Sequence, residues 1–272
     1  MRPFFGNFSK NIIRSLARLK KRYRILISTF VVSLTFLYAT FFPPDKVFLF
    51  FFVFIILSYL STYFSILENI EGVEWFSLFV MPVVISMTFY IFYFLFPGRW
   101  LTRIPFLVVF FISFYAILLS NNILNTTVEK NIQLYRAAFS VNYLFQSISF
   151  FLFGVILFSL FKGPLVNFLA VFLFSFLLSL QFIWSITLKE RINLEVLRYV
   201  LFISFLISQI ALVLSFAPVS EVMFGLTISA FFYFISGYVY LVLEERLFPE
   251  NLREFWTVIS IVVMLLLFSL RF

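Results

Sequence analysis

The chain contains nine runs of predominantly apolar residues, each about long enough to cross a lipid bilayer. A membrane-spanning helix needs about 20 such residues, because it rises about 1.5 Å per residue and the hydrocarbon core is about 30 Å thick. The runs occupy residues 25–42, 46–67, 75–96, 101–120, 138–161, 164–188, 198–217, 220–243 and 255–270. The sequence therefore predicts an all-α, polytopic transmembrane helix bundle of about nine spans, within a range of about eight to ten.

The composition argues against a soluble fold. Of the 272 residues, 63% are hydrophobic and 12% are charged, whereas soluble domains are about 45–50% apolar and about 25% charged. The 46 Phe residues are expected to serve largely as lipid-facing residues, in place of Leu and Ile. We divide the chain into a basic amphipathic tail, residues 1–24, and a transmembrane helical domain, residues 25–272.

The tail is strongly basic and contains no acidic residue. Apolar residues recur in it at helical spacing, which is typical of a helix lying among lipid headgroups. The alternative is an irregular tail whose charge only orients the first span. Seven basic residues are the candidates for contact with anionic headgroups or for control of topology: Lys10, Arg14, Arg18, Lys20, Lys21, Arg22 and Arg24.

The distribution of basic residues predicts the orientation of the chain. Lys and Arg concentrate in cytoplasmic connections. If the N-terminus lies in the cytoplasm, the inner segments hold fifteen of the 20 Lys and Arg residues and the outer segments hold five. We therefore predict a cytoplasmic N-terminus, and we expect a multi-pass integral protein of the bacterial cytoplasmic membrane.

Most reactive residue types are missing. The chain has no Cys and no His, and Asp45 is its single Asp. Disulfides, thiol catalysis and histidine ligation of metals or haem are therefore excluded. Charged residues stay out of the centres of the apolar runs, which disfavours proton-relay mechanisms. Asp45 stands beside Lys46 in a short turn, where a capping role is expected. We predict no catalytic site, no cofactor, no metal and no nucleic-acid partner.

Two connections predicted to lie on the inner side are acidic. Glu68, Glu71 and Glu74 join the second and third runs, and Glu244 and Glu245 follow the eighth. The segment Glu244–Phe248 resembles the paired-glutamate opening of the CAAX-type intramembrane protease family. That family continues with Arg where this chain has Pro249, and it uses histidines that this chain lacks, so the resemblance implies no protease activity.

Several amide side chains lie inside the apolar runs, where each must find a hydrogen-bond partner. They are Asn142, Gln146, Asn167, Gln181 and Gln209. Contacts between helices are one interpretation, which the small residues at helical spacing in the same runs favour. A polar cavity shared by spans five, six and seven is the other. Pro82 is the one proline well inside a run, and it predicts either a hinge or a static kink.

These features favour a structural or accessory membrane subunit. Such a subunit would present its helix faces, basic tail and acidic connections to membrane lipids or to a membrane-protein partner. The alternative is a carrier or flippase for an apolar or lipid-like solute, which would use the amide set and Pro82. A lipid-modifying enzyme is third, and it would require at least two carboxylates to converge. The candidates for that convergence are Asp45, Glu68, Glu71, Glu221, Glu244 and Glu245.

Overall fold

The computed structural model describes residues 20–66, 72–126, 132–160, 163–188 and 193–270. The predictions made for Lys10, Arg14, Arg18, Glu68 and Glu71 lie outside these ranges. The described elements are α2 (Lys21–Ala39), η1 (Pro44–Lys46), α3 (Val47–Ile66), α4 (Glu74–Tyr93), α5 (Trp100–Thr126), α6 (Ile132–Leu160), α7 (Pro164–Thr187), α8 (Leu194–Leu214), α9 (Glu221–Leu243) and α10 (Pro249–Ser269).

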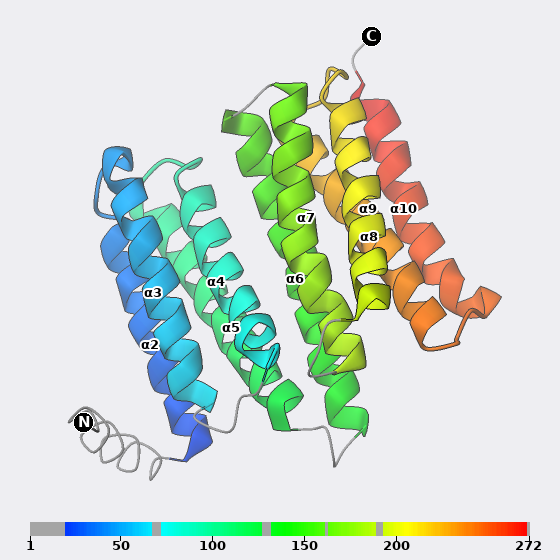
Figure 1. Ribbon diagram of the computed structural model, residues 1–272. Helices are drawn as coiled ribbons and strands as arrows, with labels where there is room; N and C mark the ends of the chain where they lie inside the picture. Colours follow the sequence, from blue (N-terminus) through cyan, green and yellow to red (C-terminus); the bar gives the residue numbers. More distant parts are fainter. Residues whose placement is uncertain (1–19, 67–71, 127–131, 161–162, 189–192, 271–272) are drawn as a thin grey trace, which may run out of the picture.

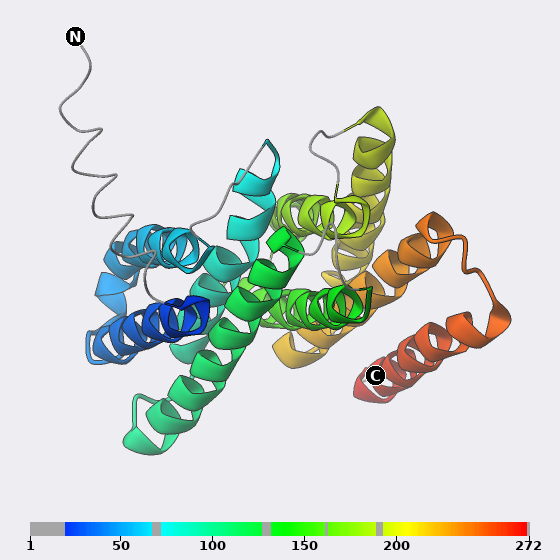
Figure 2. The same ribbon diagram turned by 90° about the horizontal axis from the view of Figure 1, so that it is seen from below.

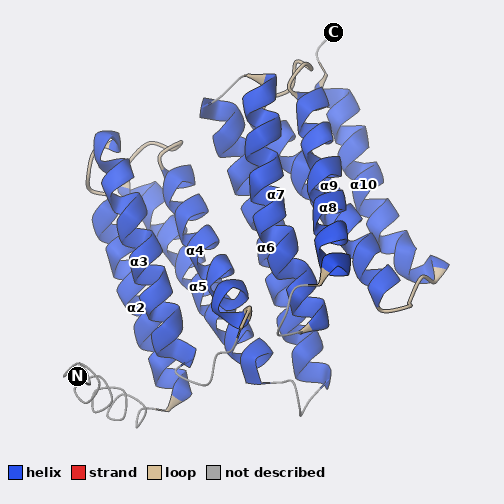
Figure 3. Cartoon of the chain, in the orientation of Figure 1, coloured by secondary structure: helices blue, strands red, loops and turns tan. Residues whose placement is uncertain are grey.

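The predicted fold class is confirmed. Nine of the described helices are long and apolar enough to cross a membrane, and no strand occurs among the described residues (Figure 3). The helices run up and down, so α2 begins at one end of the bundle and α10 ends at the other (Figure 1). We call these ends the tail side and the far side. The protein is therefore a multi-pass integral membrane protein.

The helices form two groups. Helices α2 to α5 pack against one another, and helices α6 to α10 form the second group. Contacts of α4 with α6 and α7, and of α5 with α6, join the two groups. Figure 2 shows α2 and α3 at one edge of the bundle and α10 at the opposite edge. Helix α4 is consequently the most enclosed span and α10 the most peripheral.

Aromatic rings fill the core of the first group. Phe36 of α2 is fully buried and stacks on Phe110 of α5 with ring centroids 4.7 Å apart. Its edges meet the rings of Phe54 and Tyr90. Aromatic pairs in these geometries contribute about 0.5–1.5 kcal/mol beyond the burial of their area. A part of the Phe content therefore serves packing within the bundle, in addition to the lipid-facing role expected from the sequence.

Glycine permits close contact in the second group. A Cβ atom placed on Gly225 of α9 would lie 2.7 Å from the backbone oxygen of Phe151 on α6, and one placed on Gly154 would lie 2.7 Å from the Cα atom of Gly225. Small residues allow helix backbones to approach in this way inside membranes. The contact between α6 and α9 therefore depends on the absence of side chains at both positions.

Two predicted boundaries differ from the structure. The runs 101–120 and 138–161 predicted a connection over residues 121–137. Instead α5 continues to Thr126 and α6 already begins at Ile132. Polar residues near the end of α5 bond to neighbouring helices: the Ser120 hydroxyl donates to the backbone oxygen of Ala138 on α6 over 2.9 Å, and Asn121 donates to the backbone oxygen of Leu78 on α4.

Candidate functional site

Two of the predicted intramembrane amides pair directly. The Nε2 atom of Gln146 on α6 donates to the Oε1 atom of Gln181 on α7, and both residues are fully buried. Asn142 lies one turn earlier on α6 and is also buried, but its Nδ2 atom has no partner among the described residues. The pair joins α6 to α7 as the packing interpretation requires, and Asn142 extends the polar cluster by one turn.

The remaining two amides lie elsewhere. Asn167, near the start of α7, donates from Nδ2 to the hydroxyl of Ser215 at the end of α8 over 2.8 Å. It precedes Gln181 by fourteen residues, about 21 Å along the helix. Gln209 is exposed on α8. The five amides therefore occupy three places and do not line one common cavity.

Pro82 lies inside α4 and is buried. Because proline has no N–H, the backbone oxygen of Leu78, four residues earlier, loses its helical donor. The Nδ2 atom of Asn121 on α5 donates to this oxygen over 2.6 Å. The neighbouring helix thus replaces the hydrogen bond that Pro82 removes, which favours a static kink over a free hinge.

Asn121 was not among the candidates from the sequence, because its segment was expected to be a connection. It is fully buried. A sequence signal for it does exist: a proline inside a span predicts an unpaired carbonyl four residues before it, and so a donor on an adjacent span. Asn121 lies on the next span along the chain and is one of the few residues there with an N–H donor in its side chain.

Serine side chains hold several other helix contacts. The hydroxyls of Ser58 on α3 and Ser86 on α4 are 2.7 Å apart. Ser28 on α2 donates to the backbone oxygen of Ser61 on α3 over 3.1 Å. Ser229 on α9 donates to the backbone oxygen of Ser147 on α6 over 2.8 Å. The small polar faces seen in the sequence therefore serve packing at these positions.

A second polar contact that the sequence did not indicate joins α6, α9 and α10. The hydroxyl of Tyr143 on α6 donates to the backbone oxygen of Tyr233 on α9, and the two rings stack with centroids 4.9 Å apart. The Tyr233 hydroxyl in turn donates to the Oε1 atom of Glu254 on α10 over 2.6 Å. This chain of contacts attaches the peripheral helix α10 to the bundle at the tail side.

The acidic connections lie at the tail side of the bundle. Glu74 is the first residue of α4. Glu244 follows α9 and lies 3.8 Å from Arg246, and Glu245 adopts a positive φ of 55° where the chain leaves the helix. Of the carboxylates proposed to converge, Glu244 lines a polar hollow of about 240 Å³ together with Glu195, which the sequence analysis did not single out.

The other predicted carboxylates do not join this hollow. Asp45 lies in η1 between α2 and α3, and Glu221 is the first residue of α9. Both positions are at the far side, a helix length away from Glu244. The geometry therefore pairs Glu244 with Glu195 and not with Asp45 or Glu221.

The basic residues at the start of α2 have different surroundings. Lys20 is the N-cap residue of α2 and is exposed, as is Arg22. Arg24 is only 4% exposed, so it packs within the bundle. The segment proposed to meet lipid headgroups therefore turns inward at Arg24.

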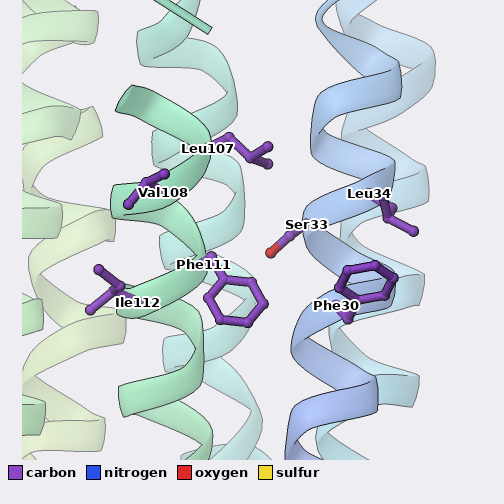
Figure 4. A pocket seen from close by; sticks show the side chains of 7 residues that line it. All are labelled: Phe30, Ser33, Leu34, Leu107, Val108, Phe111 and Ile112. Atoms are coloured by element: carbon purple, nitrogen blue, oxygen red, sulfur yellow. The ribbon is translucent and has the colours of Figure 1, made fainter. Parts of the chain in front are cut away.

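Two hollows open on lipid-facing surfaces. One of about 300 Å³ lies between α2 and α5, and Figure 4 shows Ser33 of α2 pointing toward Leu107 and Phe111 of α5. A groove of about 570 Å³ lies between α8, α9 and α10. Its walls include Gln209 and Val213 of α8, Phe231 and Phe234 of α9, and Val263 and Leu266 of α10. Both are lined almost entirely by apolar side chains.

The described residues thus place polar side chains in contacts between helices and leave apolar hollows on the outside. No group of three or more Asp and Glu side chains that would suit a metal ion occurs among them. Comparisons of the chain with known protein families, with curated proteins and with solved structures find no match.

Proposed function

We propose that this protein is a non-catalytic membrane subunit, a helical scaffold that holds partner proteins or lipids against its lipid-facing surface. One observation carries the proposal: several buried amide side chains inside the spans join one helix to another. Gln146 with Gln181, Asn167 with Ser215, and Asn121 with Leu78 are the clearest examples.

The positions of the hollows support the same function. The groove between α8, α9 and α10 and the smaller hollow between α2 and α5 are apolar and lie on the outside of the bundle. Inside a membrane such surfaces meet acyl chains or the helices of other proteins. A subunit that works by holding other molecules needs this kind of surface and needs no reactive group.

The test is purification of the full chain in native nanodiscs, followed by mass spectrometry of all retained protein and lipid. We expect a partner protein or one lipid class at a fixed ratio to the chain. Val263→Phe, which fills the groove, should reduce that retention. Ile261→Phe makes the same kind of change on the exposed face of α10 and should leave it unchanged. A chain recovered alone, in lipid of bulk composition, would contradict the proposal.

A carrier for an apolar or lipid-like solute is the second candidate, because part of the amide cluster is unpaired. The Nδ2 atom of Asn142, the Oε1 atom of Gln146 and the Nε2 atom of Gln181 are buried without partners among the described residues. A passing solute could bond to them. Movement of a fluorescent phospholipid between leaflets of proteoliposomes tests this function. A rate equal to that of protein-free vesicles, or one unchanged by Gln146→Leu, would exclude it.

A further inference from the structure

We infer that the exposed face of α8 is a dimer interface, at which Gln209 pairs with Gln209 of a second copy of this chain. Helix α8 packs against α7 and α9, and its remaining face is exposed. Phe202, Phe205, Gln209 and Val213 lie on that face. We call these four residues the α8 ridge.

The spacing of the ridge suits another helix. Its residues follow one another at intervals of three, four and four, which places them in one line along α8. Steps of three and four residues are the pattern by which two helices interlock side chains along a seam. Gln209 lies near the middle of this line, between aromatic and aliphatic neighbours.

Gln209 has no hydrogen-bond partner among the described residues. It lies five residues before the end of α8, about 8 Å along the helix, and so within the hydrocarbon if α8 spans the membrane. An amide facing lipid tails there has neither water nor protein to bond with. The surroundings of Gln209 therefore call for an occupant that supplies both a donor and an acceptor.

A second copy supplies both. A carboxamide carries donors and an acceptor, so two copies of one amide can bond to each other. Both copies cross the membrane in the same direction, which places their α8 helices parallel and their Gln209 side chains at the same depth. The chain already contains an amide pair of this kind, Gln146 with Gln181.

The groove beside the ridge fits the same symmetry. Gln209 and Val213 belong both to the α8 ridge and to the wall of the 570 Å³ groove between α8, α9 and α10. In a two-fold dimer each copy uses the same patch, so the ridge of one copy can enter the groove of the other. Residues at the boundary between ridge and groove then lie next to the axis, beside their own copies. This interface does not depend on the proposed function, because a carrier could form it as well.

Cysteine cross-linking of the full chain in lipid vesicles tests the contact. The chain has no Cys, so each introduced thiol is the only one. Val213→Cys should form a cross-linked dimer with a short bismaleimide. Phe48→Cys is the matched control, since Phe48 and Val213 are 73% and 69% exposed and each is one residue from a far-side helix end. It should remain monomeric.

The dissociation constant in the membrane, measured by single-molecule photobleaching over a range of protein-to-lipid ratios, tests the role of Gln209. Gln209→Leu should weaken dimerisation roughly ten-fold, whereas Gln209→Asn should retain most of the affinity. Equal thermal unfolding midpoints of the variant and the natural chain show that folding is unaffected. If Gln209→Leu fails to fold, the cross-linking experiment still tests the interface, because the Val213→Cys variant retains Gln209. Four outcomes would each overturn the inference. Val213→Cys could form no dimer or capture a different protein instead. Phe48→Cys could cross-link equally well, or folded Gln209→Leu could dimerise with unchanged affinity.

Discussion

Gln146 and Gln209 are the same residue type in spans of similar apolar character, yet they have opposite surroundings. Gln146 is buried between α6 and α7 and donates to Gln181. Gln209 is exposed on α8 beside an apolar groove. Leaving an amide in an apolar medium without a hydrogen bond costs roughly 2–7 kcal/mol. The difference teaches that a polar residue in a span marks a contact, and that the contact lies inside the chain in one case and is proposed to lie between chains in the other.

The same distinction separates whole helices. Over an apolar stretch of 18 residues in α4, 67% of the residues are buried, against 17% over such a stretch in α10. The first value reflects contacts of α4 with four other helices, namely α3, α5, α6 and α7, and the second reflects the contact of α10 with α9. Substitutions inside the bundle should therefore affect folding, whereas substitutions on α8 and α10 should affect binding.

The largest loss of stability is expected from a substitution where α6 crosses α9. Gly225→Ala places a methyl group 2.6 Å from a methyl carbon of Val155 and 2.7 Å from the backbone oxygen of Phe151. Since backbone atoms cannot rotate away, the helices must separate, and we expect a loss of about 3 kcal/mol in the free energy of unfolding. Unfolding in mixed micelles measures it. Gly98→Ala is the control, because a Cβ there meets atoms at 3.8 Å. An equal effect of both substitutions would show that close contact is not the cause.

An intermediate loss of stability is expected when the hydrogen bond that replaces the one removed by Pro82 is broken. Asn121→Leu leaves the Leu78 oxygen buried without a donor, at a cost of about 2 kcal/mol. Pro82→Ala restores a backbone N–H at position 82, so Asn121→Leu should cost clearly less in that background. The four unfolding free energies of this double-mutant cycle check it. Equal costs in both backgrounds would mean that Asn121 does not replace the bond removed by Pro82.

The smallest effect on the free energy of unfolding is expected from the pair of amides that joins α6 to α7, Gln146 with Gln181. Hydrogen bonds between membrane helices are worth about 0.6 kcal/mol on average, because unfolded helices also find partners in the membrane. Gln146→Leu and Gln181→Leu should therefore couple by about this amount in a double-mutant cycle. Gln209→Leu, tested on the monomer in excess detergent, should change the unfolding free energy by less than about 0.5 kcal/mol. A larger loss there would place the partner of Gln209 within the same chain.

Much of the fold was predictable from the sequence, but the pairing of its polar groups was not. The apolar runs predicted nine spans because length and apolarity alone satisfy the bilayer. The end of α5 was placed too early because Asn121 looks like a connection residue until its partner on α4 is known. The amides were recognised as needing partners, yet their division into three places depends on which helices are neighbours.

The sequence by itself determined that this protein lies in a membrane, that it has about nine spans and that polar residues within the spans must find hydrogen bonds, since these follow from local composition and from the low dielectric of the membrane. Only the tertiary structure decided which bonds form. Asn121 reaches Leu78 because α5 packs on α4, and Gln146 reaches Gln181 because α6 packs on α7. Gln209 reaches no partner among the described residues because it lies on the exposed face of α8, away from α7. Contacts between spans depend on helix order and rotation, which residue composition does not encode locally.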